Sequence, residues 1–90
     1  MKDEPTTQEL RARLLGNYRL EDLTMEARVF EDGDRLMCQA SGQDAFGLKW
    51  QGGDEFRADF DGDVRVVFDA DAQGFTLYQG GGKVHADRMP

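Results

Sequence analysis

The feature that most constrains the fold of this chain is a period-two alternation of apolar and polar residues. The run from Leu23 to Val29 alternates in this way, and so does the run from Val64 to Phe68. This period is typical of a strand with one buried face and one exposed face. Short segments rich in Asp and Gly, such as 31–34 and 61–63, separate the runs and favour tight turns. The pattern therefore predicts an all-β fold of successive hairpins.

The spacing of these runs predicts about eight strands between Tyr18 and Ala86. No connection reaches the dozen or more residues that a parallel crossover needs, so each strand should pair antiparallel with the next. Closing eight such strands on themselves would remove the exposed edges of the sheet. We therefore expect an eight-stranded up-and-down antiparallel β-barrel or half-barrel that is lipocalin-like.

One short helix is predicted before the first strand. Thr6 and Glu9 have the spacing of a capping box, and Leu10 and Leu14 lie one turn apart on the same face. Gly16 is expected to end the helix in the left-handed conformation that glycine tolerates. A helix of three turns or fewer is not stable alone, so the face of Leu10 and Leu14 should cover an open end or an apolar flank of the barrel.

The length of the chain, 90 residues, fits one small domain. We expect residues 1–6 to form an N-terminal extension and residues 7–90 to form a single lipocalin-like domain.

Eighteen acidic and eleven basic residues give a formal net charge of −7. This charge disfavours binding to nucleic acid and to anionic membranes. No signal peptide or transmembrane segment is recognisable, so the protein would be cytoplasmic if the chain is complete, and its location is otherwise undetermined.

The sequence contains no recognisable catalytic or metal-binding constellation. Ser41 is the only serine, and it has neither a lysine three positions later nor a glycine elbow around it. Cys38 should be a buried thiol, whereas His85 should face water. Residues 69–74 match the opening of a calcium loop, but the twelfth position is Gly80 instead of Glu. We expect no catalytic residue, no cofactor, no metal and no enzymatic activity.

Six aromatic residues fall on the apolar side of the predicted strands. The simplest interpretation is that they form one core cluster. Eight-stranded barrels also include proteins that hold one small ligand, so the same residues could line an apolar ligand site. These possible lining residues are Phe46, Trp50, Phe56, Phe60, Phe68 and Phe75.

A series of glycine, apolar and charged residues extends in order along nearly the whole chain. The series is Glu9, Leu10, Gly16, Tyr18, Gly33, Leu36, Gly42, Gln43, Leu48, Phe56, Phe68, Asp69, Gly74, Leu77, Gly82, Ala86 and Arg88. In this order and spacing the chain resembles the C-terminal lipocalin-like domain, of unknown function, that is appended to serine beta-lactamase-like and penicillin-binding-protein-like hydrolases. The chain departs from the family at Leu14, where the family usually has Tyr, and in the short connection from Phe60 to Val64.

The resemblance implies a barrel that supports a separate catalytic domain, by assembling subunits or by shaping access to the active site. The family's catalytic serine, lysine and tyrosine belong to the partner domain, so no active-site residue is carried over to this chain. We therefore expect a non-catalytic accessory or interaction domain, whose partner would be a beta-lactamase-like serine hydrolase domain or a second copy of itself. The alternative is a stand-alone barrel that binds a small apolar ligand.

Overall fold

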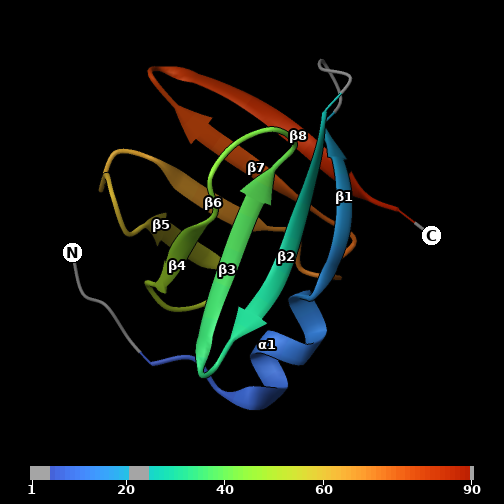
Figure 1. Cartoon of the computed structure of the whole chain (residues 1–90), viewed down its shortest axis with the longest axis vertical. Helices are drawn as coiled ribbons and strands as arrows, with labels where there is room; N and C mark the ends of the chain where they lie inside the picture. Colours follow the sequence, from blue (N-terminus) through green and yellow to red (C-terminus); the bar gives the residue numbers. More distant parts are fainter. Residues whose placement is uncertain (1–4, 21–24, 90) are drawn as a thin grey trace.

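A computed structural model, which describes residues 5–20 and 25–89, confirms the closed eight-stranded antiparallel barrel (Figure 1). Each strand pairs antiparallel with the next one in the chain, and β1 pairs with β8. None of the described strands therefore has a free edge. Its elements are α1 (Gln8–Leu14), β1 (Gly16–Leu20), β2 (Glu26–Asp32), β3 (Arg35–Ala40), β4 (Phe46–Trp50), β5 (Glu55–Ala58), β6 (Arg65–Phe68), β7 (Gly74–Gln79) and β8 (Gly82–Arg88).

The period-two pattern assigns the faces of the strands correctly. Val66 and Phe68 of β6 are buried, whereas Arg65 of the same strand is exposed. Burying alternate apolar side chains inside the barrel supplies most of the favourable free energy of folding. Leu23 and Thr24, which were predicted to begin the second strand, lie outside the described residues.

The alternating strand directions divide the connections between two ends of the barrel. The closed end carries α1 and the connections 33–34, 51–54 and 69–73. The open end carries the connections 41–45, 59–64 and 80–81. In Figure 1, α1 lies at the bottom of the barrel and the turn between β7 and β8 lies near the top.

Helix α1 covers the closed end, as its apolar face predicts. Leu14 is buried and Leu10 packs against the core. The Arg11 side chain is also buried, and its Nε donates to Glu31 Oε2 at 2.8 Å, which ties α1 to β2. Arg13 reaches Asp54 at 3.3 Å in the connection between β4 and β5. In the described part of the chain, no helix has the length and apolar character needed to cross a membrane.

The predicted N-terminal cap of the helix is wrong by one residue. Thr7, not Thr6, caps α1, because its Oγ1 accepts a hydrogen bond from the Leu10 backbone N–H at 3.1 Å. The Thr6 hydroxyl instead donates to the Asp34 carbonyl at 3.3 Å and accepts from Arg11 at 2.8 Å. The Thr6 hydroxyl is thus engaged by the Arg11 guanidinium and by the turn after β2. It does not cap the helix for that reason.

The predicted C-terminal glycine cap is also wrong. Leu15 is already extended, with φ −63° and ψ 142°, so the chain passes directly from α1 into β1 and Gly16 is a strand residue. A side chain caps the helix instead: the guanidinium of Arg88 donates to the carbonyls of Leu15 at 2.7 Å and Arg13 at 2.9 Å. Gly16 has φ 148°, a conformation that L side chains rarely adopt, and a Cβ there would also lie 2.6 Å from Arg88 Nη1, so glycine is favoured at this position.

Tyr18 completes this polar cluster inside the closed end. Its hydroxyl donates to the Leu14 carbonyl at 2.8 Å and accepts from Arg88 Nη2 at 2.7 Å. Burial raises the pKa of Tyr18, and the neighbouring positive charge of Arg88 only partly offsets this effect, so the phenol stays protonated and can donate. Arg88 Nε also donates to the Ala72 carbonyl at 2.8 Å. The cluster joins α1, β1, β8 and the connection between β6 and β7.

Four aromatic side chains fill the middle and the closed end of the barrel. Phe68 makes edge contacts with Phe56 and Phe75, with ring centroids 5.5 Å apart in both pairs. Tyr18 packs on Phe75 at 5.0 Å. All four side chains are buried, so this part of the barrel is solid core.

Candidate ligand-binding site

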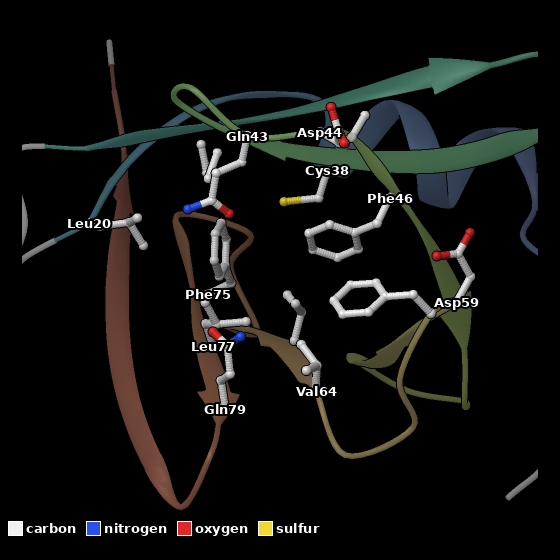
Figure 2. A pocket seen from close by; sticks show the side chains of 15 residues that line it. Leu20, Cys38, Gln43, Asp44, Phe46, Asp59, Val64, Phe75, Leu77 and Gln79 are labelled. Atoms are coloured by element: carbon white, nitrogen blue, oxygen red, sulfur yellow. The ribbon is translucent and has the colours of Figure 1, made fainter.

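The open end of the barrel contains a cavity of about 410 Å³ (Figure 2). Its lining residues come from the connections 41–45 and 59–64 and from strands β1 to β4, β6 and β7. This volume lies within the range of about 300 to 1,000 Å³ that is typical of small-molecule sites.

The floor and walls of the cavity are apolar. Phe75 and Val66, each 1% exposed, separate the cavity from the solid core below. Figure 2 shows Phe75 and Phe46 on opposite sides of the hollow. The apolar lining residues are Leu20, Ala27, Cys38, Ala40, Ala45, Phe46, Phe60, Val64, Val66, Phe75 and Leu77.

Cys38 contributes a neutral thiol to this apolar wall. It is buried on β3, as the sequence predicted, and burial raises the pKa of its thiol to about 12. The thiol is therefore protonated at neutral pH and acts as a small apolar surface. Such a thiol is a poor nucleophile, because the thiolate is the reactive form.

Polar side chains occur only at the mouth of the described cavity. The amides of Gln43 and Gln79 lie on the same side of the hollow as Phe75 in Figure 2. Asp44 adds one carboxylate, whereas the Asp59 carboxylate lies over Gly47 on the outer face of β4; all four polar residues are exposed. The cavity thus has an apolar interior and a polar entrance.

The six aromatic residues that the sequence singled out are divided between two places. Phe46, Phe60 and Phe75 line the cavity. The other three, Trp50, Phe56 and Phe68, do not line it. Trp50 is only partly buried, and its indole N–H donates to the Gly53 carbonyl at 2.9 Å.

Phe60 was predicted to be a core residue of a strand, and the structure corrects this. β5 ends at Ala58, whose N–H donates to the Val64 carbonyl at 2.8 Å and so closes the turn before Phe60 can join the sheet. Phe60 is 63% exposed. Its ring lies 5.4 Å from that of Phe46, edge to face, at the entrance of the cavity.

The potentially reactive side chains have other partners. Ser41 Oγ donates to the Glu26 carbonyl at 3.1 Å and accepts from the Glu26 N–H at 3.2 Å, which is a turn-stabilising role. His85 contacts Asp69 through Nε2 at 3.0 Å and Asp87 through Nδ1 at 3.3 Å. Among the described residues, no group of three or more His, Cys, Asp or Glu side chains is placed to hold a metal ion.

Sequence reasoning missed most of the cavity wall. The small residues Ala27, Ala40 and Ala45 leave the space that the cavity occupies, and nothing in the alternation pattern distinguishes a small residue beside a cavity from one in a packed core.

Comparisons of the chain with protein-family models, with curated proteins and with solved structures find no match.

Proposed function

We propose that this chain is a non-catalytic binding domain whose barrel holds one small apolar molecule in the cavity at its open end. The observation that supports this function best is the cavity itself, with its volume of about 410 Å³ and its eleven apolar lining residues. Transferring an apolar molecule from water to such a surface is favourable by about 25 cal/mol for each Å² buried. The aromatic core below the cavity supports the same function, because a rigid floor keeps the site open without a ligand.

Filling the cavity should abolish binding. Ala40 is half-buried on the cavity wall, so Ala40→Phe would place a ring in the space that the ligand needs. We expect the affinity for decanol, measured by displacement of a neutral fluorescent naphthylamine, to fall at least tenfold. The emission of the probe should be followed, because Trp50 lies at the closed end and is not a local reporter.

The matched control is Ala70→Phe. Ala70 is exposed in the connection at the closed end, so the same substitution there should leave decanol affinity unchanged. A second readout is independent of mutation: saturating decanol should raise the denaturation midpoint of the unaltered protein, because a ligand that binds only the folded state stabilises it. Absence of saturable decanol binding, or equal binding by the two variants, would refute the proposed function.

The second candidate is an accessory domain for a beta-lactamase-like serine hydrolase, or a module that self-associates. It is supported by the family resemblance from Glu9 to Arg88. It is also supported by Phe60, a large apolar side chain that is 63% exposed and could contact a partner. In that case the barrel would assemble subunits or shape access to an active site that lies on the other polypeptide.

Association distinguishes this candidate from ligand binding. Light scattering during size-exclusion chromatography should give a mass above that of one chain, or a complex with a serine hydrolase domain encoded beside it. Phe60→Ser should weaken that association, whereas Phe30→Ser, a change at a half-buried position on β2, should not. A monomer at all concentrations that ignores the hydrolase would exclude the accessory role.

A further inference from the structure

The floor of the cavity sets how deep a ligand can enter the barrel. Phe75 and Val66 line the cavity and are each 1% exposed, and both also belong to the packed core. The Phe75 ring is supported by Tyr18, at a centroid distance of 5.0 Å, and by Phe68, at 5.5 Å. Tyr18 is in turn held by the hydrogen bond from its hydroxyl to the Leu14 carbonyl at 2.8 Å. A ligand therefore cannot push the floor toward the closed end.

The wall of the barrel gives a ligand no side exit between the described strands. Each of these strands is hydrogen-bonded to two neighbours, and β1 pairs with β8 from Tyr18 to Leu20. The way in lies at the open end, where the rings of Phe46 and Phe60 are 5.4 Å apart. Any part of a ligand that the cavity cannot hold must therefore stay in water at this mouth.

The depth of the cavity follows from the strands that line it. On β7 the lining extends from Phe75 to Gln79, four residue steps of about 3.3 Å along a strand that tilts by about 40° in such a barrel, which gives a depth of roughly 10 Å. The volume sets a second limit. At roughly 30 Å³ for each water-sized group in a liquid, about 410 Å³ holds about 14 non-hydrogen atoms. A long-chain lipid exceeds both limits.

We propose that the site selects its ligand by length and takes a compact apolar molecule of about 14 non-hydrogen atoms or fewer, such as a medium-chain alcohol or a bicyclic hydrocarbon. This inference deepens the proposed function and rests on it. Val66 and Phe75 determine the limit, because their side chains close the cavity toward the core. A longer chain gains little from its additional carbons, since only apolar surface removed from water contributes to binding.

A series of straight-chain alcohols from hexanol to tetradecanol tests the limit. Each alcohol is titrated below its solubility limit by displacement of the neutral naphthylamine. Every methylene that enters the cavity should raise the affinity about fourfold, and we expect this gain up to about decanol. From dodecanol to tetradecanol the affinity should change by about twofold or less, which defines a plateau. The head group is the same throughout, so the series varies only the length of the tail.

The variant Val66→Ala tests whether the floor causes the plateau. It removes two methyl groups beneath the ligand and should move the plateau to an alcohol about two carbons longer. The matched control is Val67→Ala, the same substitution at the next residue of β6. Val67 is half-buried on the outer face and does not line the cavity, so this control should leave the plateau at the same alcohol.

A second variant tests the limit from the wall and serves if Val66→Ala does not fold. Ala40 lines the cavity and is only half-buried, so the chain should accept the larger side chain of Ala40→Val. The added methyl groups occupy space that the ligand needs. The plateau should therefore move to a shorter alcohol.

The outcomes separate this inference from the proposed function. An affinity that rises about fourfold for each methylene as far as tetradecanol would overturn the length limit and leave the apolar site in place. A plateau that the two cavity variants leave unchanged, or that Val67→Ala moves as far as Val66→Ala does, would overturn the cavity floor as its cause. Failure of every alcohol to displace the probe would instead refute the proposed function.

Discussion

Replacing Arg88 with methionine is expected to destabilise the protein by about 3 kcal/mol. Methionine keeps much of the apolar stem but removes the hydrogen bonds to the carbonyls of Arg13, Leu15 and Ala72 and to the Tyr18 hydroxyl. Hydrogen bonds from a charged donor are worth about 1.5 to 3 kcal/mol each, and the carbonyls left without a partner add a desolvation cost. The losses are smaller than their sum, because water can reach part of the cluster.

Urea denaturation of the Arg88→Met variant measures this effect. The control is Arg65→Met, which removes an exposed guanidinium 3.6 Å from Glu55 on the outer face of the barrel and should cost less than about 1 kcal/mol. Hydrogen exchange adds a local readout, since the amides of α1 should exchange faster when the helix end loses its cap. A loss below 1 kcal/mol for Arg88→Met would show that the cluster contributes little.

Truncating Phe56 to alanine is expected to cost about 3 to 5 kcal/mol. The ring is fully buried and contacts Phe68 edge to face at 5.5 Å, so its removal leaves a void in a core that cannot collapse around it. A domain of this size has a total stability of roughly 5 to 15 kcal/mol, so the variant should be close to unfolding. Denaturant titration of both proteins measures the difference in unfolding free energy, provided that this free energy depends on denaturant concentration with the same slope in each.

Phe60→Ala is the matched control for Phe56→Ala. The same atoms are removed, but Phe60 is 63% exposed, so the cost should be about 0.5 kcal/mol or less. If Phe56→Ala does not fold, Phe56→Leu should fold with a loss of about 1.5 kcal/mol and keep the comparison possible. Equal losses for Phe56→Ala and Phe60→Ala would contradict the assigned positions of the two rings.

The barrel was predictable from the sequence because its determinants are local. Alternation identifies the buried face of each strand, as at Val64, Val66 and Phe68, all three of which are buried. Turn chemistry is equally local: Gly80 and Gly81 both have positive φ, 59° and 81°, as a two-residue hairpin between paired strands requires. Short connections then leave only up-and-down pairing, whereas the choice between a closed barrel and a half-barrel is decided by the pairing of β1 with β8 in the structure.

The position of the cavity was not predictable from alternation alone. A period of two tells whether a side chain points inward, but not how far along the barrel it lies. Strand direction supplies that information: Phe46 begins β4 and Phe60 follows β5, so both reach the open end, whereas Trp50 ends β4 and Phe56 lies near the start of β5. Phe60 also shows where a pattern fails, because the turn begins before the alternation stops.

The role of Arg88 could have been read from its position in the pattern. Arg88 continues the row of Val84 and Ala86, so a charged residue is aimed at the interior of the barrel. A charge in that place needs several partners. What sequence could not supply was their identity, since they are backbone carbonyls of residues more than 70 positions earlier and of a turn.

The pairing of β1 with β8 has a consequence for biosynthesis. A ribosome synthesises β1 before β8, so nearly all of these residues must be made before Tyr18 can contact Arg88. Until then both outer strands of the growing sheet offer unsatisfied backbone groups to other chains. Contacts so distant in sequence also slow folding. The interval before β1 pairs with β8 is therefore when newly made molecules are most exposed to aggregation and have most need of chaperones.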